Sequence, residues 1–325
     1  MKRFAALILL IFTLITLSAC TNDKKADIVT TMFPQYDFAR QIVGDKMTVS
    51  LLIPPGAEIH DYEATSKDMV AIKEAKLFIF TSLDIDTWIK NPESIGGKDT
   101  IVLNLSESFN EVEHDHHHDT HLKQTQLLLV EDDHDHDHDL HFWTDPLIAI
   151  QLIEAILEKI IEIDPENQAY YEANAHEYIH EIEELHEEID TFFQLPTYKD
   201  STIFFAGHNA MGAFGERYHI EIISLFENFK PDADLTSAEL TTFINQVLAS
   251  GTHFLFIEEL VEPKAANKIK LELQNRHQYP LTLLELHGYH NITRSEMEAG
   301  VSYYDLLSRN FENLKIALGA SQIEI

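Results

Sequence analysis

The sequence predicts an α/β protein with two lobes, each built on a mostly parallel sheet, and one long helix that bridges them. Three observations predict this fold class. Short, continuous apolar segments recur along the chain, as is typical of parallel strands that are buried on both faces. Stretches with a helical spacing of apolar residues separate these segments. A longer helical pattern near the middle divides the chain into two halves of this kind.

The first half of the chain is expected to form one α/β lobe. A helical pattern over residues 36–43 lies between its first two apolar segments, and a loop with Gly96 and Gly97 precedes its last one. The segments are short and continuous, which favours strands over helices. We therefore expect strands at residues 28–32, 48–53, 77–80 and 101–103.

The second half repeats this alternation and predicts a second lobe. Its apolar segments are each followed by a helical pattern, one of which begins at about Pro263. The last pattern, at about residues 303–318, has no polar feature that suggests a role beyond structure. The strands are expected at residues 202–205, 252–257 and 281–286.

The pattern between the two halves predicts a long amphipathic helix. Asp164 and Pro165 form a typical helix start, in which an N-cap residue precedes proline at the first helical position. Apolar residues then recur at helical spacing for about six turns, until Pro196 ends the pattern. The apolar stripe that faces inward consists of Tyr171, Tyr178, Ile182, Leu185, Ile189 and Phe192.

The N-terminus has the pattern of a secretory signal. Lys2 and Arg3 precede an apolar run at residues 4–17, which is too short to span a bilayer comfortably. Small residues then lead to Cys20, and residues 17–20 resemble the bacterial lipobox, in which the cysteine is lipidated and becomes the new N-terminus. The alternative is an ordinary signal peptide with a cysteine there by chance. We expect a protein anchored by lipidated Cys20 on the extracytoplasmic face of the cell membrane.

One segment interrupts the α/β pattern of the first half. Nine of the nineteen histidines lie between His114 and His141, mostly interleaved with aspartates. Such a polar tract cannot bury a core, so we expect a mobile loop. The expected organisation is a signal peptide at 1–19, a tether at 20–26, an N-terminal lobe at 27–163 with a His/Asp-rich loop at 114–140, a linker helix at 164–195 and a C-terminal lobe at 196–325.

Composition limits the classes of partner. The formal charge is −32, which disfavours nucleic acid and anionic lipid surfaces and attracts cations, although acidity also serves solubility. Cys20 is the only cysteine, so the exported chain has no internal disulfide and no thiolate for a metal or for catalysis. Any transition-metal site must therefore use nitrogen and oxygen donors.

Four histidines lie at junctions where such a site could form. His60 follows a predicted strand and the turn at residues 54–56, and His141 precedes a predicted helix. His208 and His290 each follow a predicted strand and a glycine. Each one alone fits a surface or capping histidine. Because ligands bind at the carboxyl ends of strands in open α/β sheets, we expect the four to meet at a metal site in the cleft between the lobes.

Five parts of the sequence share a further pattern: residues 31–39 (TMFPQYDFA), 55–65 (PGAEIHDYEAT) and 141–146 (HFWTDP), the strand-helix junction at His208 and the segment at 292–300 (ITRSEMEAG). Together they resemble the zinc and manganese substrate-binding proteins of bacterial ATP-driven (ABC) importers. The resemblance extends through nearly the whole mature chain. It implies two α/β lobes joined by a long, stiff helix, with the ion held between them, and a membrane permease as partner.

The resemblance also assigns metal ligands. His60, His141 and His208 fall on the three positions at which the family has nitrogen donors. The fourth position, which is Asp or Glu in the family, is held here by His290; Glu285, His287 or a water are the alternatives. A further departure is Ile59, where some zinc-binding relatives have a carboxylate.

Ligand chemistry favours zinc as the bound ion. Three or four imidazoles suit Zn²⁺, whereas Mn²⁺ prefers carboxylate and water oxygens. A manganese or iron site that uses Glu285 in place of His290 remains the alternative within the family. A closed tetrahedral site also argues against hydrolysis, because catalytic zinc keeps an open position. We therefore expect a monomeric carrier that delivers Zn²⁺ to a permease and is not an enzyme.

The His/Asp-rich loop resembles the insertion of the zinc-specific members of the family. We expect weak, fast-exchanging sites that raise the zinc concentration near the cleft or sense zinc abundance. The alternative is a solvated insertion with incidental metal affinity. The histidines concerned are His114, His116, His117, His118, His121, His134, His136 and His138.

Two other functions compete with transport. His176, Glu177 and His180 match the H-E-x-x-H pattern of zinc metalloproteases. The match lies on the predicted linker helix, where the burial of Tyr178 would turn both histidines toward solvent, and no third histidine follows at the expected spacing. The other possibility is a surface adhesin in which the metal has a structural role.

Overall fold

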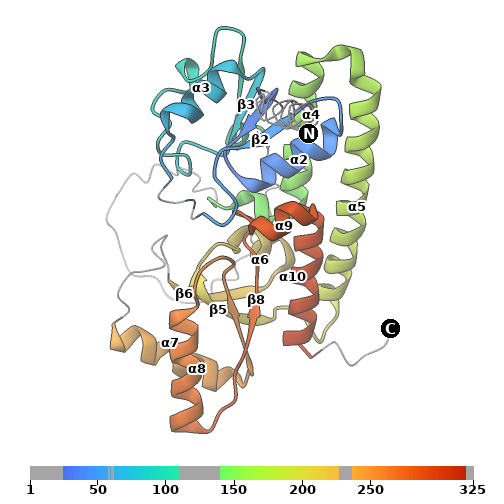
Figure 1. The fold of residues 1–325 in the computed structure, drawn as a ribbon. Coiled ribbons are helices and arrows are strands. Elements are labelled where there is room, and N and C mark those ends of the chain that lie inside the picture. Colours follow the sequence, from blue (N-terminus) through green and yellow to red (C-terminus); the bar gives the residue numbers. More distant parts are fainter. Residues whose placement is uncertain (1–24, 58, 60–61, 110–139, 227–235, 320–325) are drawn as a thin grey trace, which may run out of the picture.

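The chain folds into two α/β lobes stacked end to end, with long helices beside both of them (Figure 1). The computed structural model describes residues 25–57, 59, 62–109, 140–226 and 236–319. Within these residues each lobe contains a four-stranded sheet in which every strand pair is parallel. The predicted fold class, two mostly parallel α/β lobes, is confirmed.

The N-terminal lobe is built on a sheet with strand order β2-β1-β3-β4. All residues of its two central strands, β1 and β3, are buried, because helices cover both faces of the sheet. The predicted strand at 48–53 is shorter in the structure. The elements are β1 (Ile28–Thr30), α2 (Phe33–Val43), β2 (Val49–Leu51), α3 (Ser66–Glu74), β3 (Leu77–Phe80), η2 (Pro92–Ser94), β4 (Ile101–Asn104) and η3 (Leu105–Glu107).

The C-terminal lobe has the sheet order β6-β5-β7-β8, in which β7 lies between β5 and β8. The predicted strands and helices of this half are present, and β6 is an additional strand that the sequence reading did not separate from the helix before it. The elements are β5 (Thr202–His208), α6 (Gly212–Tyr218), β6 (Glu221–Phe226), α7 (Ser237–Ser250), β7 (Phe254–Ile257), α8 (Lys264–His277), β8 (Thr282–Glu285), α9 (Arg294–Ala299) and α10 (Tyr303–Ala317).

A helical hairpin connects the two lobes. The short η4 (Phe142–Thr144) leads into α4 (Pro146–Ile163), and η5 (Pro165–Asn167) then turns the chain into the 27-residue α5 (Gln168–Gln194). The predicted inward stripe of α5 is buried as expected. Asp164 differs from the prediction, because its carboxylate accepts hydrogen bonds from the side chains of Asn167 and Tyr171 and caps no backbone N–H.

The hydrophobic core is shared by the two lobes. One continuous cluster of buried side chains runs from β1 and α2 through α4 and α5 to α6 and α10. Each lobe also has one smaller cluster, which fills the far side of its sheet. The long helix therefore packs against both lobes and is not an exposed tether between them.

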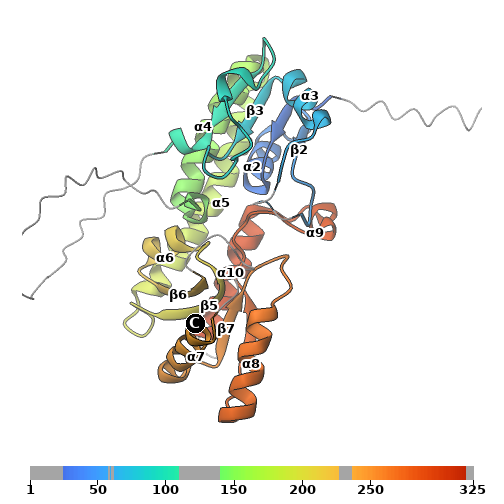
Figure 2. The ribbon, with the colours of Figure 1, turned by 90° about the vertical axis from the view of Figure 1, so that its left-hand side faces the viewer.

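The C-terminal helix adds a second connection between the lobes. Figures 1 and 2 show α10 lying beside α5, with α9 next to the N-terminal lobe. The carboxylate of Asp37 in α2 accepts hydrogen bonds from the hydroxyl of Tyr178 in α5 and from the backbone N–H of Tyr303 in α10. Closer to the cleft, Gly56 N–H donates to the carbonyl of Ile292 (2.8 Å). These contacts limit the lobes to small relative movements.

Candidate metal centre

Three buried histidines from separate parts of the chain converge between the lobes. His208 is the last residue of β5, His290 lies in the connection from β8 to α9, and His141 directly precedes η4. Their exposed fractions are only 3% for His141, 4% for His208 and 8% for His290. One ligand nitrogen from each ring lies within 4.8 Å of the others. The structure thus brings together three of the four histidines predicted from the sequence.

The nitrogen separation matches that of a tetrahedral zinc site. The Nε2 atoms of His141 and His208 are 3.3 Å apart. Two nitrogens that each lie about 2.0–2.1 Å from a tetrahedral Zn²⁺ are separated by about 3.3–3.4 Å. The ring of His290 completes the group, with its centroid 5.1 Å from that of His141 and 5.5 Å from that of His208. An ion at the centre of these rings requires little rearrangement of His141 and His208.

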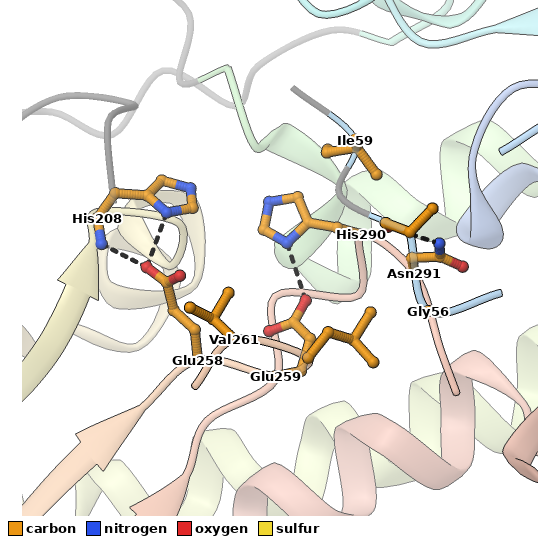
Figure 3. Close-up of a pocket in the computed structure, with 10 residues that line it drawn as sticks. Gly56, Ile59, His208, Glu258, Glu259, Val261, His290 and Asn291 are labelled. Atoms are coloured by element: carbon orange, nitrogen blue, oxygen red, sulfur yellow. Dashed lines mark hydrogen bonds and ion pairs between the residues drawn. The ribbon is translucent and has the colours of Figure 1, made fainter. Parts of the chain in front are cut away.

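Two adjacent glutamates that follow β7 support two of the rings. His208 Nδ1 is 2.8 Å from Glu258 Oε1, and His290 Nδ1 is 2.9 Å from Glu259 Oε1, as Figure 3 shows. A carboxylate accepts hydrogen bonds, so the proton of each pair lies on Nδ1. That tautomer leaves the Nε2 lone pair of each ring for the centre of the site.

Glu259 is fully buried and remains ionised. Burial alone raises the pKa of a carboxyl, but the hydrogen bonds from His290 Nδ1–H and Gly288 N–H lower the pKa of Glu259. The site therefore has a fixed negative charge directly behind the ring of His290. Such a charge strengthens the attraction of that imidazole for a cation.

Local packing fixes the rings from the other side. The indole N–H of Trp143 donates to the carbonyl of Gly288 (2.9 Å), and its ring packs in T-shaped contacts with the rings of His141 and His290. Asp145, at the start of α4, caps the backbone N–H of Leu147 and pairs with Arg217 of α6. The segment that carries His141 is therefore fixed to the C-terminal lobe.

The pocket at the histidines is too small for a drug-sized ligand. It has a volume of about 120 Å³, far below the roughly 300–1,000 Å³ of pockets for drug-sized molecules. Figure 3 shows His208 and His290 on opposite sides of it with Glu258 and Glu259 behind them. Gly56, Ala57 and Ile59 line the pocket from the N-terminal lobe. Both lobes therefore contribute to its wall.

The other predicted ligands lie elsewhere or outside the described residues. Glu285 is 3.5 Å from Arg309 of α10, and His287 Nδ1 accepts the backbone N–H of Tyr289. Burial lowers the pKa of His287, which keeps its ring neutral at neutral pH. Neither residue belongs to the group of three histidines. Outside the described residues lie His60, Cys20 and the eight loop histidines His114, His116, His117, His118, His121, His134, His136 and His138.

The H-E-x-x-H segment lies on the solvent-facing side of α5. His176 and His180 are exposed, whereas Tyr178 between them is buried, as the helical pattern predicted. His180 Nε2 is 3.8 Å from Glu184, one turn along the helix. Among the residues that the structure describes, only His141, His208 and His290 form a group of three or more closely spaced metal-ligating side chains.

The two glutamates that contact the rings, Glu258 and Glu259, were not predicted from the sequence. They directly follow the predicted strand at 252–257, which is the same kind of position that singled out His208 and His290. Glu285 was the only carboxylate predicted from the sequence as an alternative ligand. Their position after a strand marks Glu258 and Glu259 as candidates, but it does not identify the rings that they contact.

The fold and the buried histidines define a two-lobed α/β binding protein with a candidate transition-metal site. A family model described as "Zinc-uptake complex component A periplasmic" (ZnuA) matches residues 28–317. The chain belongs to this family. In the part of the chain that the structure describes, no helix has both the length and the apolar character needed to cross a membrane.

Curated relatives carry names that refer to zinc. The chain is 28% identical to the "High-affinity zinc uptake system protein ZnuA" of Bacillus subtilis (strain 168), over 98% of both chains. It is 26% identical to the "Zinc-binding lipoprotein AdcA" of Streptococcus pneumoniae (strain R6), over 97% of this chain and 61% of AdcA. The chain thus spans nearly all of the Bacillus protein but only about three fifths of the streptococcal one.

Solved structures share the same fold. The metal-dependent lipoprotein YcdH of Bacillus subtilis superposes with a TM-score of 0.71 at 26% identity, covering 89% of this chain and 98% of YcdH. The Zn(II)-bound ZnuA-like domain of Streptococcus pneumoniae AdcA gives a TM-score of 0.70 at 23% identity, covering 90% of this chain and 99% of that domain. The second likeness, at lower identity, shows the fold alone.

Proposed function

We propose that this protein is the zinc-binding component of an uptake system and that it holds one Zn²⁺ between its lobes. The observation that carries the proposal is the convergence of three buried imidazoles, two of them with Nε2 atoms 3.3 Å apart. Membership of the zinc-uptake family and the names of the relatives support the same ion. His141, His208 and His290 are the proposed ligands from the described residues.

His60 is the proposed fourth ligand. It follows Ile59 directly in the sequence, and Ile59 lines the pocket together with His208 and His290. With His60 the site has four nitrogen donors and no open position, as in zinc sites that bind without catalysis. Four imidazoles also favour zinc over manganese, which prefers oxygen donors. Competition of Zn²⁺ and Mn²⁺ at fixed pH checks this choice, and tighter binding of Mn²⁺ would contradict it.

We further propose a carrier that releases its ion to a membrane permease of the ABC type. The predicted lipidation of Cys20 would hold it, as a monomer, on the extracytoplasmic face of the cell membrane. The contacts that α5 and α10 make with both lobes favour small tilts on binding over a wide hinge motion. A permease would then recognise the zinc-loaded arrangement of the lobes.

The His/Asp-rich loop at 114–140 has the proposed role of an auxiliary zinc collector. Its histidines directly precede His141 in the sequence, so weakly bound ions would stay close to the cleft. A variant that lacks residues 114–138 is expected to bind one tightly held zinc as before and to lose additional weak binding. Loss of the tight site would contradict a purely auxiliary role.

Zinc titration of the processed protein against a chromogenic chelator tests the ligand set. Alanine at His60, His141, His208 or His290 should lower the zinc affinity by more than the roughly 10–100-fold that loss of an outer-shell partner causes. Alanine at Glu285 or His287 should leave one tightly bound zinc per chain. The exposed His277 provides the control, because its removal changes the number of histidines but not the cleft. Full affinity in the His208→Ala variant would overturn the assignment.

A further inference from the structure

Glu258 and Glu259 lie on one short segment that contacts two proposed ligands from different parts of the chain. Since β7 lies between β5 and β8 in the sheet, the residues after β7 adjoin the ends of both neighbours. Glu258 turns toward His208 at the end of β5, and Glu259 turns toward His290 beyond β8 (Figure 3). The position of β7 between β5 and β8 thus explains how two consecutive residues form hydrogen bonds with two separate proposed ligands.

Each carboxylate fixes the backbone as well as a ring. Glu258 Oε1 also accepts the backbone N–H of His208, and Glu259 Oε2 accepts the backbone N–H of Gly288 at 2.9 Å. A Cβ at residue 207 would lie 2.1 Å from Glu258 Oε1, so glycine is required there for this approach. The two loops that carry His208 and His290 are therefore positioned by the same segment.

The charge of the two carboxylates matches that of a divalent ion. Neutral imidazoles leave the full +2 charge of Zn²⁺ inside a buried site, where an uncompensated charge is costly. Glu258 and Glu259 together supply −2, each at one hydrogen bond from a proposed ligand. Both side chains are at least nine-tenths buried, so solvent screens this interaction only weakly.

We propose that Glu258 and Glu259 are positioning residues of the zinc site. They hold His208 and His290 with the proton on Nδ1, aim both Nε2 lone pairs at the ion, and balance its charge from outside the coordination sphere. This inference rests on the proposed function, since it concerns the same site. It adds that the affinity of the site depends on two carboxylates that do not touch the ion.

Glutamine substitution tests the role of the charge with little change in shape. Glu258→Gln and Glu259→Gln should each lower the zinc affinity by roughly 10–100-fold, with one zinc per chain retained at saturation. Glu262→Gln, on the same segment but exposed to solvent, is the matched control and should bind like the unsubstituted protein. Visible spectra of the Co²⁺-loaded variants should retain tetrahedral bands, because the ligands themselves are unchanged.

A second measurement separates this inference from the proposed function. In the metal-free protein, ¹⁵N NMR of the imidazoles should find His208 and His290 protonated at Nδ1, and Glu258→Gln should alter only the His208 signal. If the unsubstituted chain bound no zinc, the proposed function would fall, whereas the NMR result would still report on the two glutamates. Affinity unchanged within twofold in both glutamine variants, or Nδ1 without a proton in either ring, would overturn the inference.

Discussion

Asp86 shows how a single buried side chain sets a pH dependence. Its carboxylate accepts hydrogen bonds from the backbone N–H of Thr81 (2.7 Å) and the hydroxyl of Thr31 (3.3 Å). Burial raises its pKa to about 6 even though these hydrogen bonds oppose the rise. The folded protein thus holds this proton more tightly than the unfolded chain, in which an Asp has a pKa of about 3.9. Protonated Asp86 therefore makes its full contribution to the free energy of unfolding at pH values below about 3.9.

As the pH rises from about 4 to about 6, this contribution to stability is lost. The Asp86→Asn variant has no carboxyl at this position and so lacks this pH-dependent contribution. The free energy of unfolding of the variant minus that of the unsubstituted protein should therefore be about 2–3 kcal/mol higher at pH 7 than at pH 4. Urea denaturation of the metal-free proteins at both pH values measures the change. Asp84→Asn, an exposed neighbour, is the control. An equal difference at both pH values would refute a raised pKa.

The sequence allowed the prediction of ligands but not of their supports. His141, His208 and His290 were predicted as ligands because each stands beside a strand or helix end, which is a local property. The role of Glu258 and Glu259 depends on β7 lying between β5 and β8, and this order is set by long-range packing. A carboxylate after a strand, seen without that order, has the pattern of a solvated turn residue.

Among the elements, three helices meet at one buried carboxylate. Asp37 of α2 is paired with Arg40 and accepts hydrogen bonds from Tyr178 of α5 and Tyr303 of α10. Arg40 in turn donates to the carbonyls of Gly300 and Val301, which precede α10. This network joins the bridging helix to elements of both lobes.

Removal of the Tyr178 hydroxyl tests the network. Tyr178→Phe keeps the packing of the ring but deprives the buried Asp37 carboxylate of one hydrogen bond, which should lower the free energy of unfolding by about 1–3 kcal/mol. Chemical denaturation of the metal-free protein measures this loss. Tyr170→Phe, on the exposed side of the same helix, should change stability by less than about 0.5 kcal/mol. Equal effects of the two substitutions would contradict the role of Asp37.

The elements differ in how well the sequence predicted them. The stripe of α5 was clear because the helix is long and amphipathic, and six predicted members are all buried. Its start was less clear, since the proline after Asp164 opens the separate turn η5 before α5 begins at Gln168. Strand β6 was not predicted separately because it begins directly after α6, at Glu221, and its residues at the edge of the sheet are at most partly buried.

For the whole molecule, the alternation of strands and helices was sufficient to predict two parallel lobes. The sequence did not indicate that α10, from the C-terminal lobe, would contact α2 of the other lobe. Contacts of this kind join residues more than 250 positions apart, and a local sequence pattern does not predict them. The shared core that results explains why only small tilts of the lobes are expected.

The account predicts that zinc binding changes the shape of the molecule only slightly. Two helices and one continuous core connect the lobes, so the metal-free and zinc-loaded forms should have nearly the same radius of gyration. Small-angle scattering of both forms checks this, with the EDTA-treated protein reloaded with Zn²⁺ as the control for reversibility. A large compaction would show that the lobes open widely in the metal-free state.

The central claim is that imidazoles from separate parts of the chain bind one zinc ion between the lobes. Anomalous diffraction at the zinc edge, from crystals of the zinc-loaded protein, tests it most directly. The predicted result is a single strong peak about 2.0–2.1 Å from the Nε2 atoms of His141, His208 and His290. A tightly bound zinc located away from these three nitrogens would contradict the account.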